Sequence, residues 1–242
     1  MSTVFITGSG RRIGRNLALL FAKSGWNIGL HCNNSVEMAE KTRGEILAMG
    51  RAASLVQFDL RDVSKIRMGF AETCCKIGVP DVLVNCAGVF PERTAIEGIS
   101  PEMWDDTMNI NTRAAMFCSQ IFVELCENNP AAERKIINIA SLGGLEIWKQ
   151  RIPYNVSKAA LIQLTKALAR ELAPNFAVNA VCPGTILVPD ESAKSEIDVS
   201  KIPMKRYGTV ADLFSAVIFF AECPNFITGQ ILNVDGGNHL IK

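Results

Sequence analysis

Tyr154 and Lys158 have the residue types and the spacing best suited to acid–base chemistry in this chain. Residues four positions apart lie on one face of a helix, so the phenol and the ammonium group are expected side by side. An unperturbed phenol titrates near pH ~10, and a cation beside it favours the phenolate and lowers its pKa. Ser141 follows the apolar run 136–139 and adds a hydroxyl that could hydrogen-bond a substrate oxygen. The three residues predict a general acid with a neutral donor beside it, although this Tyr–Lys spacing also occurs on ordinary exposed helix faces.

A glycine-rich segment, residues 7–14, directly follows the apolar run 4–6. Glycines let a backbone turn tightly and approach a diphosphate, whose charge is then stabilised by the N-terminus of the following helix. The usual G-x-G-x-x-G spacing is broken, because Ile13 stands where the third glycine belongs and Gly14 comes one residue later. The segment therefore predicts an expanded dinucleotide-binding turn, with a strand-to-helix turn that binds no ligand as the alternative.

The elements that must position these residues alternate along the chain between short β-rich segments and longer helical patterns. The expected strands are residues 4–7, 27–32, 53–57, 82–85, 136–139, 178–182 and 231–234. This alternation predicts an α/β fold, a doubly wound seven-stranded parallel sheet with helices on both faces. Helix starts are marked by Ser100 before Pro101 and by Thr209 three residues before Asp212. Ligands of such sheets bind at the carboxyl ends of the strands, where segment 7–14 and Ser141 both fall.

The composition limits the classes of partner. The 242 residues are 48% apolar with a net charge of +1, which fits one domain over residues 1–242 and provides no basic stripe for nucleic acid or an anionic membrane. No apolar run approaches the roughly 18 residues that span a bilayer, and the first strand begins too early for a signal peptide, so we expect a cytoplasmic protein. Eight cysteines without a C-x-x-C pair, and only two histidines, favour free thiols and no metal site. The polar segment 187–207 is long enough for a lid beside the site.

Over its full length the chain resembles the short-chain dehydrogenase/reductase family. Segment 7–14 matches the family's cofactor turn, residues 85–88 its strand-end motif, residues 183–184 the turn beside the nicotinamide, and residues 235–237 its C-terminal signature. The catalytic tetrad of the family falls on Asn111, Ser141, Tyr154 and Lys158. Cys86 departs from the pattern, because it replaces the second asparagine of the strand-end motif.

The resemblance implies a Rossmann-like domain, assembled as a homotetramer or homodimer, that transfers hydride between a nicotinamide cofactor and a carbonyl-type carbon of a small-molecule substrate. Tyr154 would protonate the developing alkoxide, and Lys158 would hold the ribose hydroxyls and depress the pKa of Tyr154. Ser141 would polarise the carbonyl, and Asn111 would position a water for proton relay. The alternative from another class is a sensor that binds the cofactor without catalysis, and the intact tetrad argues against it.

The expected cofactor follows from the end of the second strand. NAD sites place a carboxylate there for the ribose hydroxyls, but residues 31–35 contain no acid. Asn34 and Ser35 offer donors to a 2′-phosphate and Arg11 or Arg12 offers positive charge, so we expect NADPH/NADP+. The expected cofactor contacts are Gly8, Arg11, Arg12, Ile13, Gly14, Asn34, Ser35, Asp59, Leu60, Asn85, Ala87, Gly88, Tyr154, Lys158, Pro183, Gly184 and Ile186. Among them, Asp59 resembles the aspartate with which the family contacts the adenine, with a simple loop carboxylate as the alternative.

The residues expected to contact the substrate support two different substrate classes. Arg12 stands where most of the family has glycine, a mark of the pteridine-reductase branch, and Phe90 falls where those enzymes stack an aromatic ring on a flat heterocycle. Ser141 favours a carbonyl instead, because pteridine reductases usually carry aspartate there. We therefore expect hydride transfer to the C=O or C=N group of a pteridine or dihydropteridine or, as the alternative, to a 3-oxoacyl-type carbonyl. The expected substrate contacts are Phe90, Ser141, Trp148 and Tyr154.

Overall fold

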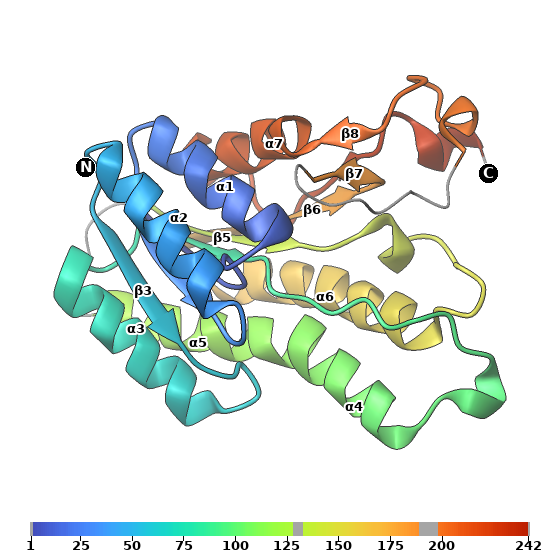
Figure 1. Ribbon diagram of the computed structural model, residues 1–242, viewed down its shortest axis with the longest axis horizontal. Coiled ribbons are helices and arrows are strands. Elements are labelled where there is room, and N and C mark those ends of the chain that lie inside the picture. Colours follow the sequence, from blue (N-terminus) through green and yellow to red (C-terminus); the bar gives the residue numbers. More distant parts are fainter. Residues whose placement is uncertain (1, 128–132, 189–197, 242) are drawn as a thin grey trace.

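The computed structural model describes residues 2–127, 133–188 and 198–241. Seven strands form one sheet in the order β3-β2-β1-β4-β5-β6-β9, and each neighbouring pair is parallel (Figure 1). The strands are β1 (Thr3–Ile6), β2 (Asn27–Cys32), β3 (Ala53–Gln57), β4 (Val82–Asn85), β5 (Arg134–Ile139), β6 (Phe176–Pro183) and β9 (Ile231–Val234). The predicted doubly wound parallel sheet is therefore confirmed. A small second sheet pairs β7 (Ile186–Leu187) with β8 (Gly208–Thr209).

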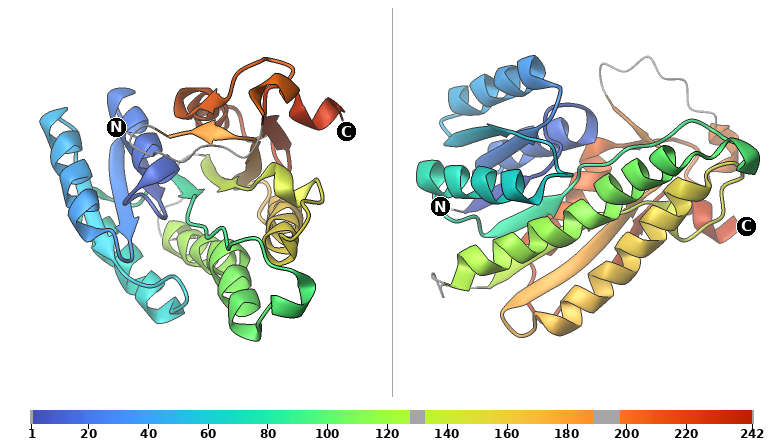
Figure 2. Two further views of the ribbon diagram at one scale, coloured as in Figure 1. Left: turned by 45° about the vertical axis from the view of Figure 1, so that its right-hand side comes forward. Right: turned by 90° about the horizontal axis from the view of Figure 1, so that it is seen from below.

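Helices cover both faces of the sheet. One layer holds α1 (Arg12–Lys23), α2 (Val36–Ala48) and α7 (Val210–Glu222), and the other holds α3 (Val63–Ile77), α4 (Pro101–Met108), α5 (Ala114–Glu127) and α6 (Ile152–Glu171) (Figure 1). A π-helical turn, Asn109–Arg113, joins α4 to α5. Figure 2 shows α6 running beside α4 and this turn, so the second layer brings the start of α6 close to the loop after β4.

The central strand β1 shows why the sequence adopts this layered fold. Val4 and Ile6 are completely buried in the core beneath α1 and α7, while Phe5, between them, faces the opposite core. There the Phe5 ring packs on Phe70 of α3, with 4.3 Å between ring centroids. Strands buried on both faces need continuous apolar runs, which is what residues 4–6 provide.

The topology places a site at the carboxyl end of β1. The chain leaves β1 toward β2 on one side and later returns to β4 on the other side, so the connections diverge at this point. Ligands of doubly wound sheets bind in the crevice at such a switch point. Figure 1 shows the turn before α1 and the segment after β4 at this end of the sheet.

The predicted helix starts are confirmed. The hydroxyl of Ser100 accepts a hydrogen bond from the amide of Met103 at the start of α4. Thr209 and Asp212 bond each other's backbone amides at the start of α7, a complete capping box. All eight cysteines are free. Within the described residues no helix has the length and apolar character needed to cross a membrane, and no cluster of three or more His, Cys, Asp or Glu residues forms.

The expected lid, 187–207, is described only in part, since residues 189–197 lie outside the described residues. Its last part packs on the turn after β9. The amide of Met204 donates to the carbonyl oxygen of Gly236 at 3.2 Å, and Ile202 and Pro203 lie against Gly236 and Gly237. These contacts join the segment to the end of the sheet that carries the predicted site.

Candidate active site

The ends of β1 and β4 are tied together by Thr7. Its Oγ1 accepts hydrogen bonds from the amides of Cys86 at 3.0 Å and Ala87 at 3.1 Å. Gly8 follows with φ of +68°, and a Cβ on it would come within 2.7 Å of the Cα of Ala87. Both the left-handed backbone and the close approach require glycine here, so the turn passes directly against the β4 end.

The rest of the predicted cofactor turn is packed just as closely. A Cβ on Gly10 would lie 2.2 Å from Oγ of Ser35, and a Cβ on Gly14 would lie 2.3 Å from the carbonyl oxygen of Gly8. Arg12 takes φ of +52°, a conformation that glycine adopts with less strain. The segment therefore forms the expanded turn that its spacing predicts, and it lies against the start of α2.

Two helix N-termini at this turn have no side-chain cap. Neither Arg11 before α1 nor Ser35 before α2 caps its helix, whereas α3, α4 and α7 are capped by Asp62, Ser100 and Thr209. Uncapped first-turn amides carry partial positive charge and bind anions well. The first turn of α1 also contains no acid. This end of the sheet therefore offers backbone donors of the kind that bind phosphate groups.

Charged side chains around the turn divide into two groups. The Arg15 guanidinium forms an ion pair with the Glu45 carboxylate at 2.8 Å, which joins α1 to α2. Arg11 and Arg12 are exposed at the start of α1, and Asn34 is exposed at the end of β2. The arginines expected to supply positive charge thus lie on the same side as the uncapped helix starts.

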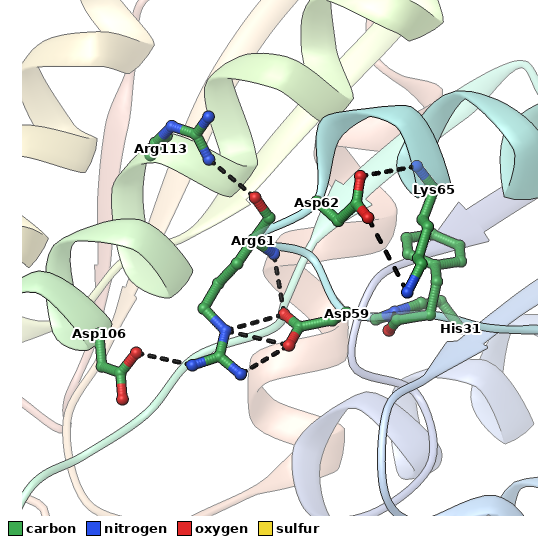
Figure 3. Close-up of polar contacts among 8 residues, drawn as sticks. His31, Asp59, Arg61, Asp62, Lys65, Asp106 and Arg113 are labelled. Atoms are coloured by element: carbon green, nitrogen blue, oxygen red, sulfur yellow. Dashed lines mark hydrogen bonds and ion pairs between the residues drawn. The ribbon is translucent and has the colours of Figure 1, made fainter.

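Asp59, expected at the adenine, is engaged by Arg61 (Figure 3). The Arg61 guanidinium donates to both oxygens of the Asp59 carboxylate, with a shortest distance of 2.6 Å, and to Asp106 at 2.8 Å. Arg113 donates to the Arg61 carbonyl oxygen at 3.0 Å, which ties the cluster to the π-helical turn. These bonds hold the pKa of Asp59 below its usual range. An adenine amino group would therefore share this carboxylate with Arg61, and the contact stays a prediction.

Lys158 is almost completely buried in α6. Its Nζ donates to the carbonyl oxygen of Ile139, the last residue of β5, at 2.9 Å. A Cβ on Gly88 would lie 3.6 Å from the same nitrogen, so the end of β4 is close as well. Burial lowers the pKa of Lys158 to about 8, opposed by the sulfur atoms of Cys86 and Cys182.

Tyr154 lies beside Ser141, as its predicted role requires. Oγ of Ser141 accepts the amide of Gly143 at 3.1 Å, and a Cβ on Gly143 would lie 3.1 Å from the Tyr154 ring, so the two residues meet at this glycine. Burial raises the pKa of Tyr154, whereas Ser141, Arg151 and Arg12 oppose the rise. The expectation that Lys158 depresses this pKa stays a prediction. Nζ of Lys158 lies 6.0 Å from the Tyr154 ring centroid, and the desolvation of the phenol dominates.

The side chain of Asn111 holds the loop after β4. Its Oδ1 accepts from the amide of Val89 at 2.8 Å, and its Nδ2 donates to the Val89 carbonyl oxygen at 3.0 Å and to Oγ of Ser157 at 3.0 Å. The residue sits within the π-helical turn, a distortion that is frequent at functional sites. Asn111 thus joins the β4 loop to the helix of Tyr154, and its role in a water relay stays a prediction.

Three aromatic rings meet around the phenol. Phe90, half exposed in the loop after β4, contacts Tyr154 edge-on with 4.6 Å between centroids. Trp148 stacks nearly parallel to Tyr154 at 6.0 Å and meets Phe90 edge-on at 6.4 Å. The Arg151 guanidinium covers the Phe90 ring at 4.0 Å and donates to the carbonyl oxygen of Pro91. All four predicted substrate contacts therefore lie together.

The remaining predicted residues fall into two groups. Gly184 lies at the carboxyl end of β6 beside Asp235, and Ile186 begins the small sheet next to it. Asn85 instead turns its side chain into the core, where Nδ2 donates to Asn138 at 2.9 Å. Leu60 is also buried, with 5% of its surface exposed. The side chains of Asn85 and Leu60 are thus largely buried, and their contacts with a cofactor stay predictions.

Three residues of this region were absent from the predicted set. Arg151 is the N-cap residue of α6, three residues before Tyr154. Arg61 follows Asp59 by two residues, and His31 accepts the amide of Gly8 at Nδ1. The sequence shows how close Arg151 and Arg61 are to predicted residues, but the contact between His31 and Gly8 depends on the pairing of β1 with β2.

Comparisons with known proteins agree with this geometry. A family model described as enoyl-(acyl carrier protein) reductase matches residues 8–239. The 3-oxoacyl-(acyl-carrier-protein) reductase FabG of Staphylococcus aureus is 32% identical, with 98% of each chain covered. The acetoin dehydrogenase YohF of Salmonella typhimurium is 30% identical, with a TM-score of 0.88 over 100% of this chain and 98% of that chain.

A protein from Burkholderia xenovorans assigned to the short-chain dehydrogenases/reductases has a TM-score of 0.91 at 26% identity, covering 99% of this chain and 98% of its own. The match extends from the glycine turn through the residues around Tyr154 to the turn after β9. The chain is an oxidoreductase that belongs to the short-chain dehydrogenase/reductase family.

Proposed function

We propose that this protein is an NADPH-dependent reductase that transfers hydride to the carbonyl group of a small substrate. The observation that carries the proposal is the placement of Ser141 and Tyr154 on either side of Gly143, at the strand end where Lys158 is anchored. The 3-oxoacyl reductases and the acetoin dehydrogenase among the relatives are named for substrates that contain a carbonyl or the corresponding alcohol.

The residues at the carboxyl end of β1 fit a dinucleotide phosphate. The glycine turn lies against β4, and the uncapped starts of α1 and α2 supply backbone donors for two anionic groups. Arg11 and Arg12 would add positive charge near a 2′-phosphate, and Asn34 and Ser35 would add donors. When bound, NADPH supplies the hydride.

Tyr154 and the side chains around it would donate a proton to the substrate. The raised pKa keeps the phenol protonated at neutral pH, the form that a general acid needs for reduction. As oxygen charge develops on the substrate, Tyr154 donates its proton to that oxygen and Ser141 donates a hydrogen bond to it. The Ser141 hydroxyl and the Arg151 guanidinium, which both act to lower the pKa of Tyr154, then favour the phenolate left on that residue.

The choice of cofactor is tested by comparing kcat/KM for NADPH with kcat/KM for NADH. We expect NADPH to be favoured at least about tenfold, because a phosphate held by a charged donor gains about 1.5 kcal/mol or more. Arg12→Gly should reduce this preference. Arg15→Ala is the matched control, since Arg15 is bonded to Glu45 and should leave the preference unchanged. Equal or better use of NADH by the wild-type protein would contradict the proposal.

A pteridine or dihydropteridine substrate is the second candidate, favoured by the half-exposed ring of Phe90 beside Tyr154. Turnover of acetoacetyl thioester, diacetyl and dihydrobiopterin under NADPH separates the two, with carbonyl turnover expected. Tyr154→Phe should lose nearly all turnover while still binding NADPH. If neither the carbonyl compounds nor dihydrobiopterin are turned over, both proposed substrate classes are wrong. NADPH binding without turnover would then favour the non-catalytic sensor.

A further inference from the structure

His31, in β2, fills the space between the cofactor turn and the end of β3. Only 2% of its surface is exposed. Its Nδ1 lies 3.0 Å from the amide nitrogen of Gly8, and its Nε2 lies 3.0 Å from the carbonyl oxygen of Phe58. The imidazole also packs on the Phe58 ring, with 4.3 Å between centroids. One side chain therefore connects the diphosphate turn with the strand end that leads into Asp59.

The two bonds define the protonation state of the ring. The Gly8 amide is a donor, so Nδ1 must be the unprotonated acceptor, and a carbonyl oxygen can only accept, so Nε2 must carry the proton. Only the neutral tautomer with hydrogen on Nε2 satisfies both partners. Burial lowers the pKa of His31 to about 4, which keeps this neutral form at physiological pH, although Asp59 and the Phe58 carbonyl favour the charged form.

The backbone of His31 extends the same connection to Ser9. The amide of Ser9 donates to the His31 carbonyl oxygen at 2.8 Å, and the His31 amide donates to Oγ of Ser9 at 2.9 Å. The amides of Gly8 and Ser9 are thus both committed to His31. His31 therefore holds the backbone of the turn at the left-handed Gly8 and at Ser9, just before the start of α1, which Arg11 does not cap.

We propose that His31 is the positioning residue of the cofactor site. Its imidazole fixes the span between the Gly8 amide and the Phe58 carbonyl, and so sets the diphosphate turn relative to the adenine side of the site at Asp59. The inference rests on the proposed function, because it assigns a cofactor to this turn. His31 touches neither cofactor nor substrate in this role and acts through the backbone of Gly8.

Two variants separate the bonds of the imidazole. In His31→Asn the amide oxygen can occupy the position of Nδ1 and still accept from Gly8, but nothing reaches Phe58. In His31→Gln the amide nitrogen can occupy the position of Nε2 and donate to Phe58, but the acceptor for Gly8 is lost. Both variants lose the ring packing on Phe58, so their melting temperatures should fall together.

The dissociation constant of NADPH, measured by calorimetric titration, should distinguish these variants. We expect His31→Asn to bind within about twofold of the wild type and His31→Gln to bind about fivefold to tenfold more weakly, the usual effect of one lost hydrogen bond. kcat at saturating NADPH should change little in either variant. A purely structural residue would instead weaken binding in proportion to the loss of melting temperature, whichever bond is kept. Equal affinities of the two variants would overturn the proposal.

A second measurement needs no cofactor. Nitrogen NMR of the histidine-labelled protein should show the proton of His31 on Nε2, and the Gly8 amide should exchange slowly with solvent. A proton on Nδ1, or rapid exchange at Gly8, would refute the positioning role. Failure of the wild-type protein to bind NADPH would contradict the proposed function instead, and the NMR result would still decide whether His31 holds the turn.

Discussion

Nζ of Lys158 donates to the carbonyl oxygen of Ile139 at 2.9 Å, which fixes the buried ammonium at the strand end that leads to Ser141. The ammonium is held by a backbone carbonyl, and among the described residues the charges that act on it are those of the Cys86 and Cys182 thiols, not of a carboxylate. Burial without a full counter-charge disfavours the charged form and lowers the pKa of Lys158 to about 8. The charge of this residue therefore changes close to physiological pH.

We predict a decline in kcat/KM for NADPH above about pH 8. A lysine is charged below its pKa, so the ammonium is present through the neutral range and is lost as the pH rises past about 8. If the charge is essential, kcat/KM should fall about tenfold for each further pH unit. The parameter reports the protein before cofactor binds, which is the state whose pKa is shifted.

Two variants check the assignment of this decline to Lys158. Lys158→Met should have low activity without the decline, and Lys158→Arg, which cannot lose its proton, should move the decline to higher pH. A wild-type profile that stays flat to pH 10 would show that the ammonium is not required.

The sequence pattern predicts the bounds of all seven strands of the main sheet to within two residues. β2, β3, β4 and β9 have the expected bounds, whereas β5 begins at Arg134, two residues before the expected start. Arg134 is buried there because its guanidinium bonds Asp81 at 2.7 Å and the Pro80 carbonyl oxygen at 2.8 Å. A charged strand residue with a partner over fifty positions away leaves no signal in local hydrophobicity.

Contacts between distant parts of the sequence also limit what can be predicted of the candidate active site. The spacing of Tyr154 and Lys158 places them on one helix, but the pKa of Tyr154 depends on how deeply the fold buries the phenol, which spacing does not encode. Phe90 is expected near the substrate from its distance to Asn85, yet its contact with Arg151 joins segments that are sixty positions apart. Local pattern thus predicts which residues gather, and the tertiary packing decides their electrostatics.

Alanine substitutions at two glycines should change stability in opposite directions. A Cβ on Gly144 would lie 2.7 Å from the backbone carbon of Lys158 and 2.8 Å from its oxygen, so α6 must shift to admit it. We expect Gly144→Ala to lower the free energy of unfolding by about 1–3 kcal/mol, as overpacking does. It should also lower kcat, because the shifted helix carries Tyr154.

Gly44 is the matched control, since it lies within α2 and an added Cβ would have no neighbour within 4 Å outside the adjoining backbone. Gly44→Ala should raise the free energy of unfolding by about 0.5–1 kcal/mol through helix propensity and leave kcat unchanged. Urea denaturation of the two variants and the wild type measures both effects. An unchanged unfolding midpoint for Gly144→Ala would mean that η3, the short helix Leu142–Gly144, and α6 are less tightly packed than described.

His31 should make the protein sensitive to mild acid. Its pKa falls from the ordinary 6.5 to about 4 on folding, because burial favours the neutral ring. Between these values the unfolded chain binds a proton that the folded protein excludes, so stability is fully present above about pH 6.5 and is lost as the pH falls toward 4. Each pKa unit is worth about 1.4 kcal/mol, so the full loss of unfolding free energy is about 3 kcal/mol.

Urea denaturation at pH 7 and at pH 4.5 measures most of this loss of unfolding free energy. In His31→Asn the part of the stability loss that comes from His31 should vanish. The part that comes from aspartates with lowered pKa values should remain in both proteins. An equal loss of unfolding free energy in acid for the variant and the wild type would show that His31 does not stay neutral in the fold.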